Sequence, residues 1–276
     1  AFLAEQLAAG PRIGLHGHHL TVRAVKCYAD GALGSRGAAL LEDYSDDPGN
    51  AGLIVHDLPH LLDVSRRALA AGFQVGTHAI GDRANTLVLD IYEQIFAEEN
   101  LTDPRWRIEH AQILTAQDIP RFAQLGVIAA MQPVHCTSDM DWAEDRLCED
   151  RLAGAYAWRS LLDAGAHLAW GTDFPVERAS ALHGLYSART RTHHDGTPEG
   201  GWQAQETVTA RTALELYTAA SAYAAFLEKD LGRIQVGYLA DLTVLSGDPV
   251  ACEPADLLDM SVLKTIVQGR VVYEAE

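Results

Sequence analysis

The sequence predicts an α/β fold in which the strands of a parallel sheet alternate with helices. Five short apolar runs are separated by segments whose apolar residues recur with helical spacing. Polar residues follow these runs at regular intervals, with 32 residues from His78 to His110 and 63 from His110 to Asp173. Roughly 30 residues make one strand–helix–strand unit. Strands that alternate with helices in this way are typical of a sheet built from such units.

Each element of the alternating part follows from a local pattern. The expected strands are 22–28, 73–77, 106–109, 127–131 and 167–170, and the expected helices between them are 58–71, 83–97, 116–125 and 158–164. Gly72, Gly126 and Gly165 directly follow three of these helices, which is typical of helix ends. Residues 1–10 resemble part of an amphipathic helix, and residues 39–55, rich in Asp, Pro, Gly and Asn, predict a loop.

The pattern changes after Glu206. Helical spacing continues over 207–216 and 222–229, and three β segments are expected afterwards, at 232–236, 240–246 and 263–273. The last of these is expected to be a hairpin that turns at Gln268 and Gly269. We therefore divide the chain into an alternating part, residues 1–230, and a β part, residues 231–276.

The composition excludes several classes of function. Hydrophobic residues make up 48% of the 276 residues and the formal net charge is −17. A negative surface repels phosphate backbones, so nucleic acid is not expected as a partner. No apolar run is long enough to span a membrane, and the first residues have no signal-peptide pattern. The four cysteines form no close pair, which favours free thiols in a reducing cytoplasm.

Four polar residues stand where strands are expected to end: Lys26, His78, His110 and Asp173. The βα loops of a barrel converge at that end, where active sites are built. Imidazole and carboxylate groups suit zinc, although iron and manganese accept them too. Lys26 could serve only as a carbamate formed with CO2. Singly, each residue also fits a structural role, such as a hydrogen-bonded histidine or a turn aspartate, but the set favours a metal site.

The local strings around these residues resemble a known family. They are VKCYADGALGSRGAAL, GTHAIGDRAN, RIEHAQ, AAMQPVHCTSDMDWAEDR, GTDFPVE and, near the end of the chain, GRIQVGYLADLTVLSGDP. Together they resemble the amidohydrolase superfamily, in particular the amidohydrolase-3-like branch that includes N-substituted formamide deformylases. The resemblance implies a partial (β/α)8 TIM-type barrel, strands 4 to 8, followed by segments of a small flanking β domain.

The resemblance also implies roles for the four residues. Lys26, carboxylated by CO2, would bind one divalent ion or bridge two. Zinc is the metal expected first. His78 and His110 would complete one metal site with Lys26. Asp173 would belong with the other metal and act as the catalytic acid and base.

The sequence departs from the family pattern at its start. Family members carry an HxH motif on strand 1, and strands 1 to 3 have no counterpart in this sequence. The string from His16 to His19 lies just before the strand of Lys26, at its entry end, and is expected to be a polar loop. The sequence therefore corresponds to a C-terminal half, which we expect to be stable only together with the other half.

Three further residues are candidates for substrate contact. Asp30 could meet substrate or orient Lys26, although a turn role fits equally well. His135 could meet a substrate carbonyl, and Trp142, in an expected loop over 137–154, could line an apolar pocket. Glu109 should face away from the side of His110, since side chains alternate along a strand. The other histidines have no metal-like placement: His56, His60, His167, His183, His193 and His194.

The function expected from this pattern is metal-dependent hydrolysis of a non-peptide C–N bond, of amide or N-formyl type. Alternatives are a deaminase or cyclic-amide hydrolase on the same scaffold and a non-catalytic regulatory relative, because the fold alone does not fix the reaction. The expected partner is a small amide-type molecule in the cytoplasm. Whether the chain forms a homo-oligomer is left open.

Overall fold

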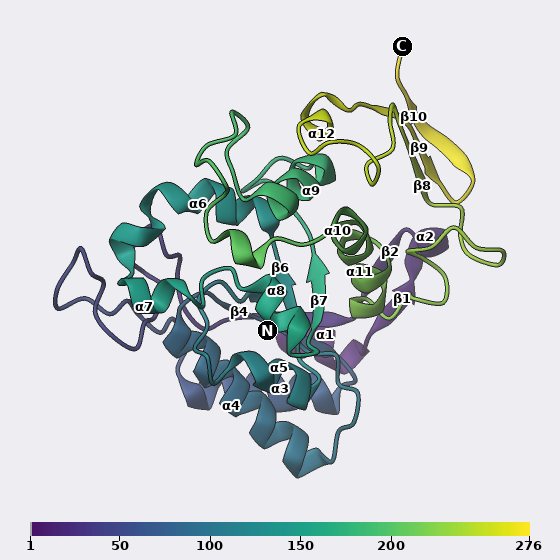
Figure 1. The fold of residues 1–276 in the computed structure, drawn as a ribbon. Coiled ribbons are helices and arrows are strands. Elements are labelled where there is room, and N and C mark those ends of the chain that lie inside the picture. The colour runs from purple at the N-terminus through teal and green to yellow at the C-terminus, as the bar shows by residue number, and fades with distance from the viewer. Residues whose placement is uncertain (1) are drawn as a thin grey trace. The chain divides into compact units, whose positions relative to one another are not determined.

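The computed structural model, which describes residues 2–276, contains a five-stranded sheet in the order β3-β4-β5-β6-β7 (Figure 1). Parallel pairing joins β3 to β4, β4 to β5 and β5 to β6. The bounds are β3 Ala24–Tyr28, β4 Gln74–Ala79, β5 Arg107–His110, β6 Ile128–Met131 and β7 His167–Trp170. This sheet with its intervening helices confirms the predicted α/β class and partial barrel.

Burial explains why these short runs form strands. All four residues of β6 are buried, as are five of the six in β4, whereas β3 at the edge buries Cys27 alone. Strands covered on both faces read as continuous apolar runs in the sequence. The predicted strand over 22–28 is split, because Leu20–Val22 forms β2 and pairs with β1, Arg12–Gly14.

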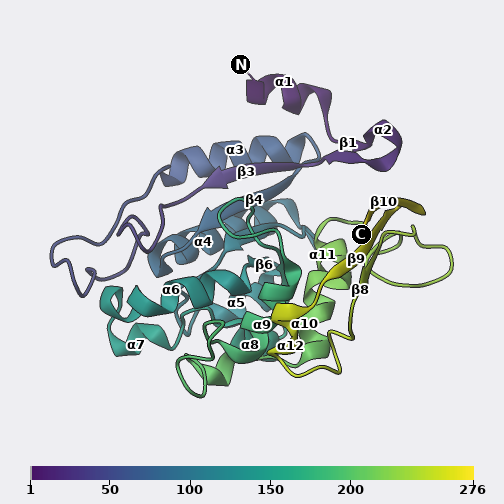
Figure 2. The same cartoon turned by 90° about the horizontal axis from the view of Figure 1, so that it is seen from above.

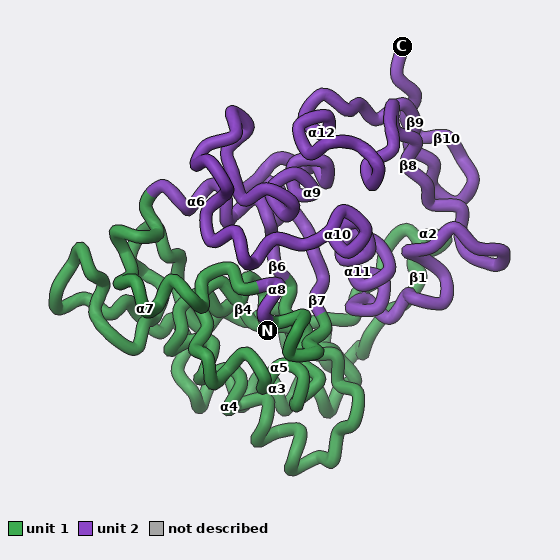
Figure 3. Tube along the Cα trace, viewed as in Figure 1, with its two compact units in different colours: residues 1–130, 142–157, 161–167 green, residues 131–141, 158–160, 168–276 purple. Residues whose placement is uncertain are grey.

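Contacts along the chain define two compact units (Figure 3). The first contains residues up to 130, 142–157 and 161–167, and the second contains 131–141, 158–160 and 168–276. The predicted division at residue 230 is not tested by this grouping and stays a prediction.

In the first unit, helices pack along the strands (Figure 2). Helix α3 begins after Asp57, whose side chain accepts a hydrogen bond from the His60 backbone. The Tyr92 hydroxyl donates to Thr77 and to the Arg107 carbonyl, which ties α4 to β4 and β5. The helices here are α1 Phe2–Ala9, α2 Leu15–His18, α3 Leu58–Ala70, α4 Asp82–Glu99, α5 Ile119–Leu125 and α7 Glu149–Leu152.

The second unit packs helices around buried aromatic rings. The buried guanidinium of Arg191 lies 4.3 Å from the Trp158 ring and 5.4 Å from the Trp202 ring. Its helices are α9 Ala181–Thr190, the 3-10 helix η1 Ala204–Glu206, α10 Ala210–Tyr217, α11 Ala219–Ala224 and α12 Asp256–Asp259. Helices α6, Pro133–Arg146, and α8, Trp158–Asp163, have residues in both units.

The C-terminal β segments form a three-stranded antiparallel sheet, β10-β9-β8. Strand β8 is Leu242–Leu245, β9 is Val262–Val267 and β10 is Arg270–Glu274. The predicted hairpin turn is confirmed, since Val267 pairs with Arg270 around Gln268 and Gly269. Both turn residues have positive φ, 49° and 77°, as a two-residue turn between twisted strands requires.

Three predicted elements are wrong. Of the helix predicted over 222–229, only residues 222–224 are helical, at the end of α11. Residues 137–154 are mostly helical, within α6 and α7, because Cys136, Met140 and Ala143 bury one side of α6 at helical spacing. Residues 232–236 form no strand, and their apolar side chains Ile234 and Val236 are 91% and 100% exposed. Without a strand partner, an alternating pattern alone does not make a strand.

The outer edge of β3 has no strand partner among the described residues. Beside this edge, an apolar cavity of about 560 Å³ lies between α1 and β3, and Phe2 on α1 is 75% exposed. Unpaired backbone groups next to apolar side chains promote association. We expect residues 1–276, produced alone, to associate in gel filtration; a monomer that melts cooperatively would contradict this.

The four cysteines are free, as predicted. Burial raises the pKa of Cys27 to about 11 and that of Cys136 to about 12, whereas hydrogen bonding by Arg151 lowers the pKa of exposed Cys148. Because the thiolate is the reactive form, a disulfide reagent at pH 8 should label Cys148 first and the two buried thiols last. The fast phase should disappear in Cys148→Ser. Its persistence there would contradict the assignment.

No helix in residues 2–276 combines the length and the apolar character needed to cross a bilayer.

Candidate metal centre

Lys26, Tyr28 and His78 lie together at the edge of the sheet. The register pairs Lys26 with Gly76 and Tyr28 with His78, so the side chains of Lys26, Tyr28 and His78 project from the same face. The Tyr28 ring centre is 5.1 Å from the Lys26 Nζ and 5.2 Å from the His78 ring centre. The length of the lysine side chain thus brings its amine toward the level of His78, two residue pairs nearer the strand end.

The buried carboxylate of Asp30 contacts the imidazole of His78. Its carboxylate is fully buried and accepts hydrogen bonds from the backbone of Ala39 at 2.9 Å, Ile80 at 3.0 Å and Gly81 at 2.8 Å. The His78 Nε2 lies 3.3 Å from the same carboxylate. That leaves Nδ1 of His78 as the nitrogen able to bind a metal, oriented as metal-ligating histidines commonly are by a second carboxylate. The placement favours a positioning role for Asp30 over the predicted substrate contact.

His110 reaches His78 through an unusual backbone conformation. Simple alternation would direct His110 away from the face of His78, but φ is 80° at His110 and 45° at Ala111. The turn brings the two imidazole rings to 4.7 Å between centres at 70°. Positive φ at residues other than glycine costs free energy and is concentrated at functional sites.

Glu109 shares the face of His78, as its register requires. Its Oε1 accepts a 2.8 Å hydrogen bond from Nε of Arg107, and this pair covers Gly76, where a Cβ would lie 2.6 Å from that oxygen. Glu109 is therefore committed to an ion pair inside the sheet. Glu109 and His110 alternate along β5, as predicted. The positive φ at His110 nevertheless turns its ring toward the face of His78.

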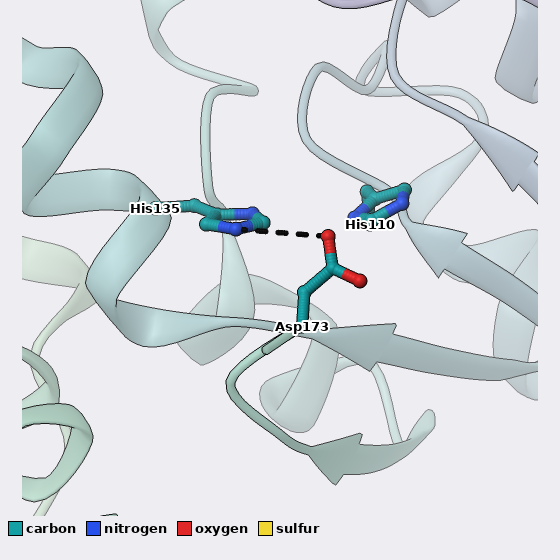
Figure 4. A group of neighbouring side chains, drawn as sticks. All are labelled: His110, His135 and Asp173. Carbon is teal, nitrogen blue, oxygen red and sulfur yellow. Dashed lines mark ion pairs between the residues drawn. The ribbon is translucent and has the colours of Figure 1, made fainter. Parts of the chain in front are cut away.

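In the second unit, His135 and Asp173 face each other (Figure 4). The His135 Nε2 is 3.9 Å from Oδ2 of Asp173. Burial lowers the pKa of His135, against the opposing effect of Glu177 and Asp173, so its imidazole is neutral near pH 7 and able to act as a ligand. Asp173 directly follows the sheet, with φ of 55°, and its side chain is 41% exposed.

Figure 4 draws His110, His135 and Asp173, each of which can offer one ligand atom to a metal. His110 belongs to the first unit and the other two to the second. The sequence predicted His110 and Asp173 as ligands but gave His135 a substrate role. Lys26 and His78 lie outside this group, and their predicted role as ligands stays a prediction.

Trp142 is used for packing. A Cβ on Gly34 would lie 3.1 Å from the Trp142 ring, and the Arg146 guanidinium lies 5.5 Å from the ring centre. These contacts give no support to the predicted pocket-lining role. The string from His16 to His19 lies between β1 and β2, where a polar loop was expected; most of it belongs to the short helix α2, which is distorted by positive φ at His16 and Gly17, 54° and 70°.

The sequence gave no reason to select His183, His193 and His194. The structure brings all three to one cavity of the second unit, with Glu177, Arg178 and Ser138. His183 comes from α9 and the other two from the segment that follows it. The adjacent histidines in THHD were the one available signal, but the sequence does not show that the loop turns back toward α9.

Comparison with known proteins identifies related chains. The model of the amidohydrolase family matches residues 7–273. A putative amidohydrolase, YtcJ, from Bacillus subtilis (strain 168) is 40% identical over 262 residues, covering 94% of this chain and 49% of its own length. An N-substituted formamide deformylase from Arthrobacter pascens is 32% identical over 216 residues, covering 77% of this chain and 39% of its own.

A solved structure agrees with these relatives. The crystal structure of an uncharacterized metal-dependent hydrolase from Pyrococcus horikoshii OT3 matches with a TM-score of 0.81 and 29% identity. The match covers 92% of this chain and 50% of that one. The chain thus spans half or less of the length of each of these three proteins.

Proposed function

Because the chain belongs to the amidohydrolase family, we propose that the protein hydrolyses a small non-peptide amide, of amide or N-formyl type, with the help of a divalent metal. The observations that carry the proposal are the candidate ligands within each unit, His78 and His110 in the first and His135 and Asp173 in the second. The name of the Arthrobacter relative, an N-substituted formamide deformylase, supports an N-formyl or amide substrate.

We assign the ligands by their chemistry. His110 and Asp173 would bind the metal together with His78, whose Nε2 is already held near Asp30. Imidazole nitrogen and carboxylate oxygen fit zinc, iron or manganese. His135 would serve as a further ligand or, as the sequence suggested, contact the substrate carbonyl. Lys26 would join only as a carbamate formed with CO2, because a carbamate offers one oxygen to each of two ions.

A bound divalent metal would lower the pKa of a water molecule toward neutral pH and would polarise the carbonyl of the substrate. Asp173 would accept a proton from the attacking water and later donate it to the leaving nitrogen, as a general base that becomes a general acid. Partial exposure of Asp173 leaves its carboxylate accessible to both groups. The neutral imidazole of His135, whose Nε2 lies 3.9 Å from the Asp173 carboxylate, would donate a hydrogen bond to the carbonyl oxygen of the substrate.

Two other functions remain as alternatives. A deaminase or cyclic-amide hydrolase would use the same ligands, because they determine how water is activated and leave the choice of leaving group open. A non-catalytic regulatory relative would keep the fold without binding metal. Lys26, His78, His110 and Asp173 are all present, and this favours a catalytic protein over one that has lost its site.

Metal content and a substrate panel test the proposal together. We expect the purified protein to contain one or two equivalents of metal, to lose activity with a chelator and to regain it with zinc. The panel should contain N-formyl amines, linear amides, cyclic amides and aminated heterocycles, assayed with and without bicarbonate. Turnover of linear substrates alone supports an amide hydrolase, release of ammonia from heterocycles supports a deaminase, and absence of metal contradicts both.

A further inference from the structure

A polar cavity of about 560 Å³ in the second unit is lined by Val134, the chain neighbour of His135, and by Glu177, which follows Asp173 in the chain. It lies between α6, α9 and the segment that follows Asp173, and Glu177 and Arg178 on that segment line it. Glu177 is close enough to His135 to influence its pKa, as Asp173 does. The wall of the cavity is therefore built from the same segments that carry His135 and Asp173.

The acidic groups of the cavity already have hydrogen-bond donors. Glu177 accepts a 2.8 Å hydrogen bond from the Ser138 hydroxyl. Asp195 accepts from the Thr197 backbone at 3.0 Å and from the Thr197 hydroxyl at 2.6 Å. These partners occupy much of the accepting capacity of the two carboxylates.

Three donors on the cavity wall have no such partner. The side chains of Arg178, His183 and His194 make no hydrogen bond and no ion pair with any described residue, although all three line the cavity. The rings of His183 and His194 meet edge to face at 4.8 Å. Arg178 can only donate hydrogen bonds, and each of the two imidazoles can donate at least one.

Tyr186 of α9 fixes the segment that carries His194. Its ring lies 5.7 Å from the His194 ring, and its hydroxyl donates to the His193 carbonyl at 2.7 Å. This segment is therefore held against the helix that carries His183. A ligand would meet two imidazoles whose positions are largely set before binding, beside the exposed side chain of Arg178.

The surroundings of His183 disfavour its protonated form. Its pKa is lowered first by burial and then by His194 and Arg178, with only Glu177 acting in the opposite direction. An anion placed among these three side chains would offset the effect of Arg178 and favour protonation of the imidazole. Among the described residues that line the cavity, Arg178 is the one permanent cation.

We propose that this cavity binds a carboxylate group of the substrate, with Arg178 as the main donor and His183 and His194 beside it. The inference rests on the proposed function, and it narrows the substrate class to amides that carry a carboxylate a few atoms from the scissile bond. A guanidinium can donate two parallel hydrogen bonds to a carboxylate, which makes arginine suited to this group. Glu177 and Asp195 on the same wall would repel a doubly charged phosphate.

Equilibrium binding tests the proposal separately from turnover. Asp173→Asn serves as a background that does not consume the ligand, and calorimetry compares N-acetylglycine with its neutral counterpart N-acetylglycinamide. We expect the carboxylate compound to bind about tenfold more tightly, the preference expected from one charge-assisted hydrogen-bonded pair. Arg178→Gln should abolish this preference, and His183→Gln should reduce it.

Arg211→Gln is the matched control, because Arg211 is exposed, lies on α10 of the same unit and is not part of the cavity wall. It should keep the full preference for N-acetylglycine. Equal binding of the two compounds by the background protein overturns the proposal, and so does a preference that survives Arg178→Gln. If Asp173→Asn shows the preference but the wild-type protein hydrolyses no amide, the carboxylate site stands and the proposed reaction fails.

Discussion

Asp173→Asn is expected to reduce kcat by about 10²–10⁴-fold, the contribution of a general acid–base group. The substitution removes the proton acceptor and weakens a metal ligand, while the side chain keeps its size. Within residues 2–276 the Asp173 carboxylate makes no hydrogen bond and lies 3.9 Å from His135, so the fold should be largely unaffected. The measurement is the rate of amide hydrolysis at saturating metal, with the melting temperature recorded for the same preparations.

Asp259→Asn is the control for that experiment. Asp259 is exposed at the end of α12 in the same unit, so the same chemical change there should leave kcat unaltered. If Asp173→Asn retains most of the wild-type rate, another group transfers the proton and the assigned role is wrong. If both variants lose activity together with their melting transition, the loss reflects unfolding and the proton-transfer role is not supported.

Asp30→Ala is expected to lower the free energy of unfolding by about 3–5 kcal/mol, because it leaves buried hydrogen-bonding groups without their charged partner. Three backbone N–H groups and His78 depend on this one fully buried carboxylate. Asp30→Asn should cost less, since one oxygen remains. Denaturant unfolding of the purified protein measures the difference.

Asp57→Ala provides the comparison for stability. Asp57 caps α3 from an exposed position, and loss of such a cap costs about 1 kcal/mol. Asp30→Asn should also weaken metal binding by about 10–100-fold if Asp30 orients a metal-binding His78. An Asp30→Ala variant no less stable than Asp57→Ala would show that the buried carboxylate contributes little.

The strands could be predicted because the sheet buries them on both faces. Strand β7, His167–Trp170, was predicted to the residue, since it is a short apolar run directly after a glycine-capped helix. Helix α6 was missed because its buried side carries Cys136, Met140 and Ala143, which give a weak hydrophobic signal among many acidic residues. Residues 232–236 show the opposite case: their apolar side chains predicted a strand, but Ile234 and Val236 are exposed to solvent.

The candidate site was predicted in part. Strand ends placed His78, His110 and Asp173 among the candidates, because parallel strands bring those ends to one edge of a sheet. Alternation could not show that positive φ turns His110 toward His78, nor that Asp30 is buried beneath it. The donors around His183 depend on how a loop returns to its helix, and residue spacing in the sequence carries no record of that path.

The most direct test of the central claim is an anomalous-difference map from crystals of the zinc-loaded protein. The account predicts a peak about 2.0–2.2 Å from a ring nitrogen of His110 and from a carboxylate oxygen of Asp173, the bond lengths of zinc to such ligands. Zinc bound elsewhere, with no peak beside either residue, would contradict the proposed metal centre and the hydrolase function that depends on it.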